Sequence, residues 1–395
     1  MKHVITLLLS LSMSAAATAA TEISDSAAVP DAPKFKITPA GRVLLDGAVI
    51  MPEGEGLTSG FTAPDVRAGA KMSYGRWAST VEVGFTYGKI GMKDVFIQYK
   101  WDDRNLIKVG HMIHKFGLTT STSSSMKPSM EEPTTASFFD LGYHPGIMFV
   151  HSGPQFYGTL SAVMAEASWT GPANDQGRSS YGGVTRLVYR PLRSSRLILH
   201  AGISGWLQSA WHKSLKDDDG NETVSPGYFD FKASFPTRVS RITMLQANIT
   251  DARHVMKLSP ELLIGRGRLA LESQYFYMNV ARRHGLPSYS ASGAYAMLRG
   301  IVLGGDYSYD LNACGLATPR PRTLEVVAAY NYTDASCRRS NINGGITNDA
   351  SVTFNYYINK YMLARLRYSY TDVRCSDLHP RRHANILQAR LQVIF

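Results

Sequence analysis

Hydrophobic and polar residues alternate one by one along much of this chain. The carboxyl-terminal segment shows the pattern clearly, because each of its two faces carries one kind of side chain. Its apolar face consists of Leu387, Ala389, Leu391, Val393 and Phe395. Its polar face consists of Gln388, Arg390 and Gln392. A period of two predicts β-strands with one apolar and one polar face. The pattern therefore predicts an all-β chain.

Turn residues between the alternating runs divide them into about sixteen strands. The expected strands cover residues 41–51, 65–75, 77–87, 93–101, 105–115, 143–152, 155–166, 181–190, 196–209, 256–265, 268–281, 292–304, 322–332, 350–358, 362–371 and 385–395. Their number is even, as expected for a bacterial barrel that begins and ends on the same side of a membrane.

Two architectures accommodate so many amphipathic strands, namely a soluble sandwich and a transmembrane barrel. Aromatic residues gather at the ends of the runs, for example at Trp77, Tyr87, Tyr330 and Tyr370, as they do at membrane interfaces. Arg and Lys also lie in the middle of the polar faces, where a water-filled lumen tolerates them. The mean hydropathy of -0.15 does not discriminate, because a barrel alternates lipid-facing and lumen-facing residues. We therefore expect a transmembrane antiparallel up-and-down β-barrel.

The lengths of the connections predict the orientation of this barrel. Short turns such as Gly75-Arg76, Gly153-Pro154 and Arg266-Gly267 fall at one end, which we assign to the periplasm. Long connections fall at the external end, and they cover residues 52–64, 116–142, 210–255, 333–349 and 372–384. Residues 305–321 depart from this rule, because they form a long connection at the periplasmic end.

The amino terminus has the layout of a cleavable secretory signal. Lys2 precedes the apolar run from Val4 to Leu11, and small residues follow up to Ala20. The apolar run is too short to span a bilayer as a helix. We expect residues 1–20 to be a signal peptide, residues 21–40 a periplasmic segment and residues 41–395 the barrel.

The charge balance predicts an anionic partner. The chain carries 42 Lys and Arg against 31 Asp and Glu. No basic run or recognition motif for nucleic acid is present, so small anions are the expected partners. His111 and His114 are three apart on an expected strand and cannot share a metal, and no motif of a catalytic or cofactor site occurs. We expect neither enzymatic activity nor a metal or cofactor.

Several basic residues lie on the polar faces of the expected strands and are candidates to line an anion path. They are Arg67, Lys71, Lys100, Lys108, Arg186, Arg190, Arg365, Arg367 and Arg390. Fixed charges in the narrow part of a pore select ions. In the alternative interpretation, some of them bind lipopolysaccharide at the rim or form ion pairs with Asp46, Glu82 and Glu272.

Five segments together resemble the phosphate-selective porin family of the porin O and P type. They are Gly41–Gly47, Lys93–Tyr99, Lys115–Leu118, Leu271–Tyr275 and Gln388–Phe395, in the order and spacing of that family. The resemblance implies a trimeric outer-membrane porin of sixteen strands. It also implies a lumen lined by a ladder of Arg, with a constriction that contains Lys and selects anions such as phosphate.

The Ser/Thr-rich stretch that ends in Ser129-Met130-Glu131-Glu132 resembles the inward-folding third loop of this family. Lys127 in this loop is the candidate for the constriction, since an ammonium attracts an oxyanion without a bidentate grip. An exposed loop lysine beside Pro128 is the alternative. The expected partners are phosphate or other small anions, outer-membrane lipid including lipopolysaccharide, and two further copies of the chain. A non-selective porin, or a barrel that acts as an enzyme or adhesin through its external loops, remains the alternative function.

Three cysteines lie in the last quarter of the chain. Cys337 and Cys375 fall in connections at the external end, whereas Cys314 falls at the periplasmic end. Loops over nearby strands can bring two Cα atoms within disulfide range, and opposite ends of a barrel cannot. We therefore predict a Cys337–Cys375 disulfide and a free Cys314.

Overall fold

The computed structural model describes nine ranges of the chain. They are residues 33–54, 56–87, 89–140, 142–165, 180–191, 197–212, 214–216, 222–378 and 381–395. The expected signal peptide over residues 1–20 lies outside these ranges. The compact unit described below is Phe35–Phe395.

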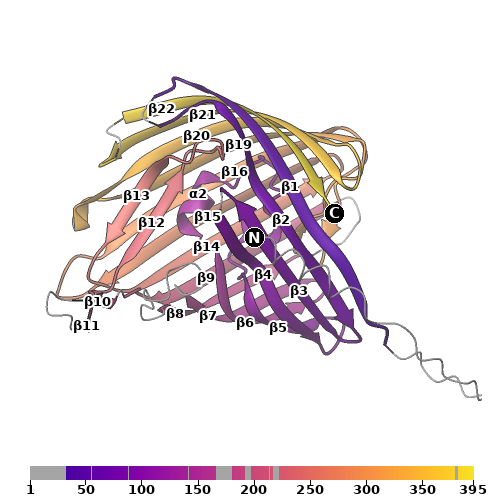
Figure 1. Cartoon of the computed structure of the whole chain (residues 1–395), viewed down its shortest axis with the longest axis horizontal. Helices are drawn as coiled ribbons and strands as arrows, with labels where there is room; N and C mark the ends of the chain where they lie inside the picture. The colour runs from indigo at the N-terminus through magenta and orange to yellow at the C-terminus, as the bar shows by residue number, and fades with distance from the viewer. Residues whose placement is uncertain are drawn as a thin grey trace, which may run out of the picture. The chain divides into compact units, whose positions relative to one another are not determined.

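Sixteen strands in the described part of the chain form a closed barrel, in which each strand pairs with its neighbour in chain order (Figure 1). They are β1 (Lys36–Met51), β2 (Gly60–Tyr74), β3 (Trp77–Thr86), β4 (Lys89–Lys100), β5 (Asn105–Ile113), β6 (Tyr143–Ser152), β7 (Phe156–Ala165), β8 (Ser180–Tyr189), β9 (Leu197–Ser209), β14 (Ala252–Arg266), β15 (Leu269–Arg282), β16 (Tyr289–Leu303), β19 (Thr323–Cys337), β20 (Ile342–Tyr357), β21 (Met362–Ser376) and β22 (Arg381–Ile394). All pairs are antiparallel, and each predicted strand corresponds to one of these sixteen. The prediction of an antiparallel barrel is confirmed.

The side chains of the barrel alternate in the sense expected of a membrane protein. Along β14, Lys257, Ser259 and Glu261 are buried, whereas Leu258 and Leu262 are exposed on the outer wall. Polar residues therefore point into the barrel and apolar residues point outward, the reverse of a soluble β-protein. Among the described residues, no helix is long and apolar enough to cross a membrane.

The first and last strands close the barrel at a seam. β1 and β22 run antiparallel, with Leu45 opposite Leu391. At the end of the seam, the backbone of Phe395 exchanges two hydrogen bonds with Gly41, at 2.9 and 3.0 Å. The terminal aromatic residue thus belongs to the seam itself. β1 begins at Lys36, five residues before the predicted start of the barrel at residue 41.

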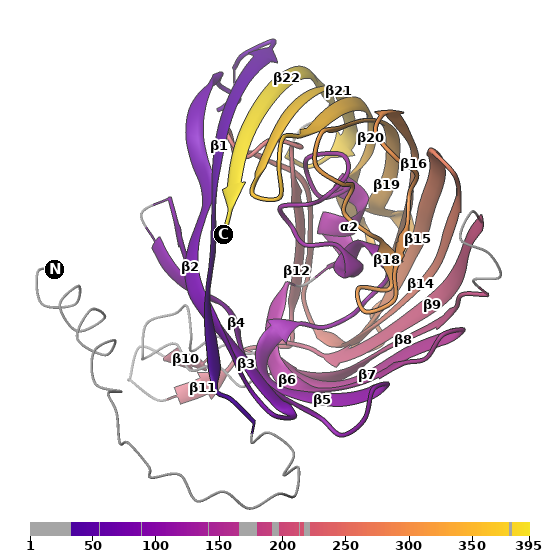
Figure 2. The ribbon, with the colours of Figure 1, turned by 90° about the vertical axis from the view of Figure 1, so that its right-hand side faces the viewer.

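The β5–β6 connection folds into the lumen, where α2 lies inside the ring of strands (Figure 2). It contains the short 3-10 helix η1 (Leu118–Ser121) and the helix α2 (Thr134–Phe139). The ring of Phe139 stacks on Phe276 of β15 at 5.2 Å, and the side chain of Lys257 donates a hydrogen bond to the carbonyl of Phe139. The expectation of an inward-folded third loop is confirmed.

The β9–β14 connection also enters the barrel from the external end. It contains the short strands β10 (Ser214–Lys216) and β11 (Glu222–Val224), and the hairpin of β12 (Phe229–Ser234) and β13 (Thr243–Ile249). Phe231 of β12 lies 6.0 Å from Phe138 of α2, between ring centroids. Arg367 of β21 donates a hydrogen bond to the carbonyl of Pro236 at 2.8 Å. The hairpin is therefore packed between α2 and the wall.

The β16–β19 connection closes part of the lumen from the opposite end. It contains the short strands β17 (Tyr309–Asp310) and β18 (Gly315–Leu316). The carbonyl of Leu311 accepts hydrogen bonds from Arg190, at 2.7 Å, and from Ser152. The backbone N–H of Tyr307 donates to the carbonyl of Gly267 in the β14–β15 turn. These partners lie at the end with the short turns, which is where this long connection was predicted.

The predicted Cys337–Cys375 disulfide is wrong, because both thiols are free. The side chain of Cys337 is buried and faces the carbonyl of Ser288, whereas Cys375 is exposed and its backbone adopts a φ of 54°. The strands β19 and β21 continue beyond their predicted ends, so both cysteines lie in strands and not in the loops where they were expected. Cys314 is free as predicted, and it is buried in the β16–β19 connection.

Candidate functional site

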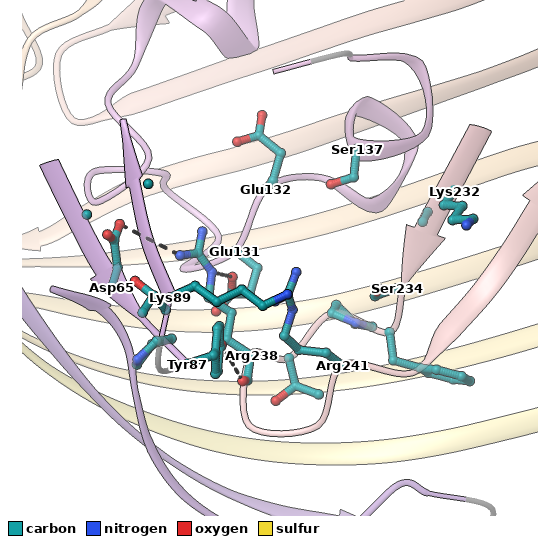
Figure 3. Close-up of a pocket in the computed structure, with 18 of the residues that line it drawn as sticks. Asp65, Tyr87, Lys89, Glu131, Glu132, Ser137, Lys232, Ser234, Arg238 and Arg241 are labelled. Atoms are coloured by element: carbon teal, nitrogen blue, oxygen red, sulfur yellow. Dashed lines mark hydrogen bonds and ion pairs between the residues drawn. The ribbon is translucent and has the colours of Figure 1, made fainter. Parts of the chain in front are cut away.

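A hollow of about 760 Å³ lies inside the barrel beside β2, β3 and β4 (Figure 3). We call it the lumen pocket. One side is the inner wall around Asp65 and Arg67, and the other sides are the inward-folded β5–β6 connection and the tip of the β12–β13 hairpin. The lumen pocket therefore lies between the inner wall at β2 to β4 and the two connections that fold inward from the external end.

Positive charge prevails in the lining of the lumen pocket. The basic side chains are Arg67, Lys89, Lys93, Lys232, Arg238 and Arg241, and the acidic ones are Asp65, Glu131 and Glu132. Six cations against three carboxylates leave an excess of three positive charges. A lining of this kind attracts anions and repels cations.

Arg238 joins the hairpin tip to the loop and to the wall. Its Nε donates to the Oε2 of Glu131 at 3.0 Å, and its Nη1 lies 3.9 Å from the Oδ2 of Asp65. The hydroxyl of Tyr87, at the end of β3, donates to the backbone carbonyl of Arg238 at 2.8 Å. The pocket is thus formed by segments that hold each other in place.

Three cations of the pocket have no carboxylate partner among the residues that the structure describes. They are Lys89 and Lys93 on β4, and Arg241 on the hairpin. The guanidinium of Arg241 lies over the ring of Tyr87 at 4.9 Å, and the ammonium of Lys93 lies 5.7 Å from the ring of Tyr143. Contacts with aromatic rings orient these cations without neutralising them, so their charge remains available to an anion.

The two carboxylates of the β5–β6 connection, Glu131 and Glu132, differ in the direction in which their surroundings shift the pKa. Burial acts to raise the pKa of Glu131, but Arg390 and Arg238 outweigh it and hold this pKa below its usual value. Burial raises the pKa of Glu132, although the ammonium of Lys127 lies 2.9 Å away. Glu131 is therefore a permanent partner of two arginines, whereas Glu132 gains a proton more easily.

Lys127 does not project freely into the lumen. Its side chain is buried, and its ammonium donates hydrogen bonds to the carbonyl of Thr119 and to Glu132. The alternative of an exposed loop lysine does not hold either. Lys127 lies within the folded loop, where it fixes η1 to the segment before α2.

The arginines predicted to line the lumen do face it, but most of them hold other parts of the protein. Arg390 pairs with Asp46 at 2.6 Å, and Arg186 pairs with Glu261 at 2.6 Å. Arg365 donates to the carbonyls of Lys127 and Ser125 in the loop. Arg367 and Arg190 hold the two inward hairpins, as described above. These arginines therefore lie outside the lining of the lumen pocket and hold the inward-folded segments to the wall.

The remaining predicted residues lie in different surroundings. Arg67 lines the lumen pocket and pairs with Asp65 and Glu82, at 2.8 Å to each. Lys108 lies over the ring of Phe96 at 4.6 Å. Lys71 and Lys100 are exposed, and Lys100 lies 3.4 Å from Asp103 beside a short turn. Of the predicted residues, Arg67 is the one in the lining of the pocket.

Five cations of the pocket were missed by the sequence analysis. They are Lys89, Lys93, Lys232, Arg238 and Arg241. The last three belong to the β9–β14 connection, which was expected to be an external loop although Phe229 and Phe231 alternate with Asp230 and Lys232 in β12. The cluster of basic residues around its hairpin was the available signal. Among the described residues, no group of His, Cys, Asp and Glu could hold a metal ion.

A family model described as phosphate-selective porin O and P matches residues 71–395. A search of curated proteins found no significant match. The matched range extends from the second half of β2 to the last residue and includes the inward connections and most of the pocket lining.

Several solved structures of outer-membrane proteins share the fold. A loop-deletion mutant of OmpT from Vibrio cholerae has a TM-score of 0.58 and 10% identity, and the match covers 91% of this chain and 99% of that one. An anion-selective porin from Comamonas acidovorans has a TM-score of 0.55 and 10% identity, with coverage of 92% and 100%. The outer membrane channel DcaP of Acinetobacter baumannii has a TM-score of 0.55 and 13% identity, with coverage of 91% and 97%.

Proposed function

Because this chain belongs to the phosphate-selective porin O and P family, we propose that its barrel conducts phosphate and related oxyanions by passive diffusion. Family and fold place the chain among the porins of the bacterial outer membrane, and a porin is a channel and not an enzyme. The proposal concerns the selectivity of this channel and the residues that produce it.

The excess of cations in the lumen pocket carries the proposal. An anion that enters from the external end meets the side chains of Lys89, Lys93 and Arg241 beside the inner wall. Each ammonium attracts an oxyanion as a point charge, so the anion is held and also released. The anion-selective porin of Comamonas acidovorans has the same fold and supports the same preference here.

The predicted arginines contribute to this selectivity at longer range. The guanidinium of Arg365 is buried and its described hydrogen-bond partners are carbonyl groups, so among the described residues no carboxylate forms a direct ion pair with it. A buried charge of this kind is screened less than an exposed one, so it acts over several ångströms. Arg67, Arg186, Arg367 and Arg390 keep the carboxylates of the lumen paired, which prevents these carboxylates from attracting cations.

Reversal potentials across a planar bilayer in a KCl gradient test the proposal. The wild-type channel is expected to favour chloride, and added phosphate is expected to compete with it. The triple variant Lys89→Gln, Lys93→Gln and Arg241→Gln should move the permeability ratio toward unity. The matched control, Arg266→Gln, Arg268→Gln and Lys360→Gln, removes the same charge at the short turns and should change the ratio less. Cation preference of the wild type would overturn the proposal.

We also propose that the protein is secreted with cleavage near Ala20 and assembles as a homotrimer. OmpT, which shares the fold, has been solved in a trimer form. Edman sequencing of the mature protein tests the cleavage. Native mass spectrometry of the protein extracted in mild detergent tests the assembly, and a monomer alone would contradict the trimer.

A further inference from the structure

A second basic cluster lies on the outer wall of the barrel, away from the lumen pocket. It is formed by Arg253 and His254 at the beginning of β14, by Arg283 just after β15 and by His212 just after β9. We call it the outer rim cluster. Arg253 and Arg283 are exposed. No residue of the cluster lines the lumen pocket.

The register of the strands shows that the cluster faces outward. Ala252 is fully buried and points into the barrel, and the pairing of β14 with β15 shifts between Ala252 and His254. This bulge lets Arg253 and His254 lie together on the outer side. Two residues further along the wall, Met256 lies opposite Leu207, and both are exposed to the membrane.

The cluster lies at the external end of the barrel. Arg266, at the other end of β14, precedes the short turn to β15, and short turns mark the periplasmic side. The beginning of β14 and the end of β15 are therefore at the level of the outer leaflet. The outer leaflet of this membrane consists of a phosphorylated glycolipid, lipopolysaccharide.

A hollow of about 790 Å³ adjoins the cluster on the same wall. Its apolar lining includes Tyr181 of β8 and Leu207 of β9. Gly183, which has no side chain, lies opposite Leu207, and the lining also includes the small residue Ser209, so the space beside Leu207 stays open. The hollow is thus apolar on its membrane side and basic at its external edge.

Charge complementarity identifies the occupant. In the part of the chain that the structure describes, neither Arg253 nor Arg283 forms an ion pair. Asp251 is the acidic residue of a neighbouring hollow of about 430 Å³ that is also lined by Arg283. We propose that the outer rim cluster binds the phosphate groups of lipopolysaccharide, with an acyl chain in the hollow beside Leu207. Guanidinium groups suit phosphate because they donate two parallel hydrogen bonds, and basic pockets at this level of a membrane bind lipid headgroups.

Binding of lipid A by the purified full-length protein, measured by native mass spectrometry in detergent, tests the proposal. Wild-type protein should retain bisphosphorylated lipid A in preference to its dephosphorylated form and to phosphatidylglycerol. The variant Arg253→Ala with Arg283→Ala should bind it on the order of thirtyfold more weakly, from the attraction of two basic side chains at a membrane surface. The control Arg266→Ala changes an exposed arginine at the other end of β14 and should bind like the wild type.

Both substitutions leave the backbone hydrogen bonds of Arg253 and Arg283 in place, so the variants are expected to fold. Heat-modified migration on gels tests this expectation. Equal retention of lipid A by the wild type and the double variant would overturn the proposal, as would equal retention of lipid A and phosphatidylglycerol. A change in anion selectivity without a change in lipid binding would assign the cluster to the channel mouth and also overturn it. Because the readout is lipid binding, its outcome is independent of the selectivity proposed for the lumen.

Discussion

Arg186 of β8 and Glu261 of β14 form a fully buried ion pair of 2.6 Å inside the barrel. Arg186 also donates hydrogen bonds to Ser121 of the β5–β6 connection and to the carbonyl of Cys314 in the β16–β19 connection. One arginine therefore fixes two segments that enter the lumen from opposite ends, and Glu261 compensates its charge.

Loss of Arg186 should destabilise both segments. Removal of one partner of a buried ion pair leaves an uncompensated charge and costs about 3–5 kcal/mol. We expect Arg186→Met to lower the unfolding midpoint and to expose the two connections to trypsin. The double variant Arg186→Met with Glu261→Met should recover part of the loss, because no charge is left unpaired. A double variant less stable than Arg186→Met would contradict this explanation.

Lys127 and Glu132 should act on selectivity in opposite directions. Their ion pair of 2.9 Å is neutral as a whole, and Glu132 lines the lumen pocket. Lys127→Met leaves the carboxylate uncompensated and should reduce the preference for anions in reversal potentials at pH 8. Glu132→Gln leaves the ammonium and should increase it. Shifts of the same sign in both variants would exclude a charge effect of this pair.

Lys115 should make the selectivity depend on pH near neutrality. Burial, together with Lys108 and Arg186, lowers the pKa of Lys115 to about 7. Its ammonium, which donates to the carbonyl of Thr120, loses its proton as the pH rises through this value. The preference for anions should therefore decrease between about pH 6 and pH 8. Lys115→Met should flatten this dependence, whereas Lys100→Met, which removes an exposed lysine, should retain it.

The same pKa predicts how stability changes with pH. In the unfolded chain Lys115 keeps its proton up to the ordinary value of 10.5, so the unfolded state binds more protons between about pH 7 and pH 10.5. Its contribution to stability therefore rises with pH through this window. Thermal unfolding of wild type and Lys115→Met, compared at pH 7 and pH 10, should show a smaller rise for the variant.

Deletion of Phe395 should impair assembly into the outer membrane. The backbone of this residue forms two hydrogen bonds with Gly41, and these bonds close the seam between β22 and β1. We expect less heat-modifiable barrel in outer-membrane fractions, with unfolded chain in its place. Gly41→Ala tests the same seam without shortening the chain, because a Cβ there would lie 2.6 Å from the ring of Phe395 and from the carbonyl of Arg67. Normal yield of both variants would show that the seam tolerates these changes.

The sequence was sufficient for the barrel, because strand alternation is a local signal. All sixteen strands were located from it, and the side of the long β16–β19 connection followed from their parity. The ends of the strands were less accurate. β19 extends to Cys337 and β21 to Ser376, beyond the predicted ends at residues 332 and 371. This error moved two cysteines from the strands into loops and produced the wrong disulfide.

The lumen was harder to predict, because its chemistry depends on pairs that are far apart in the sequence. Alternation placed Arg186 and Arg390 on the inner face, but it could not show that Glu261 and Asp46 neutralise them. Lys127 was recognised through its loop, and its burial depends on how that loop folds. Arg238 and Arg241 lie between β12 and β13, in a hairpin that folds into the lumen through contacts with distant residues, so they were missed.

The crowding of the lumen has an electrical consequence. Aromatic packing between α2, the β12–β13 hairpin and the wall fills one side of the barrel, and the β16–β19 connection covers part of its periplasmic end. Resistance is greatest where water is most confined, so we expect much of an applied voltage to fall across the lumen pocket beside Lys89 and Lys93. A charge that crosses the whole of such a field gains about 2.3 kcal/mol per 100 mV. Since the segments that confine the water differ at the two ends, inward and outward currents through a single channel should be unequal.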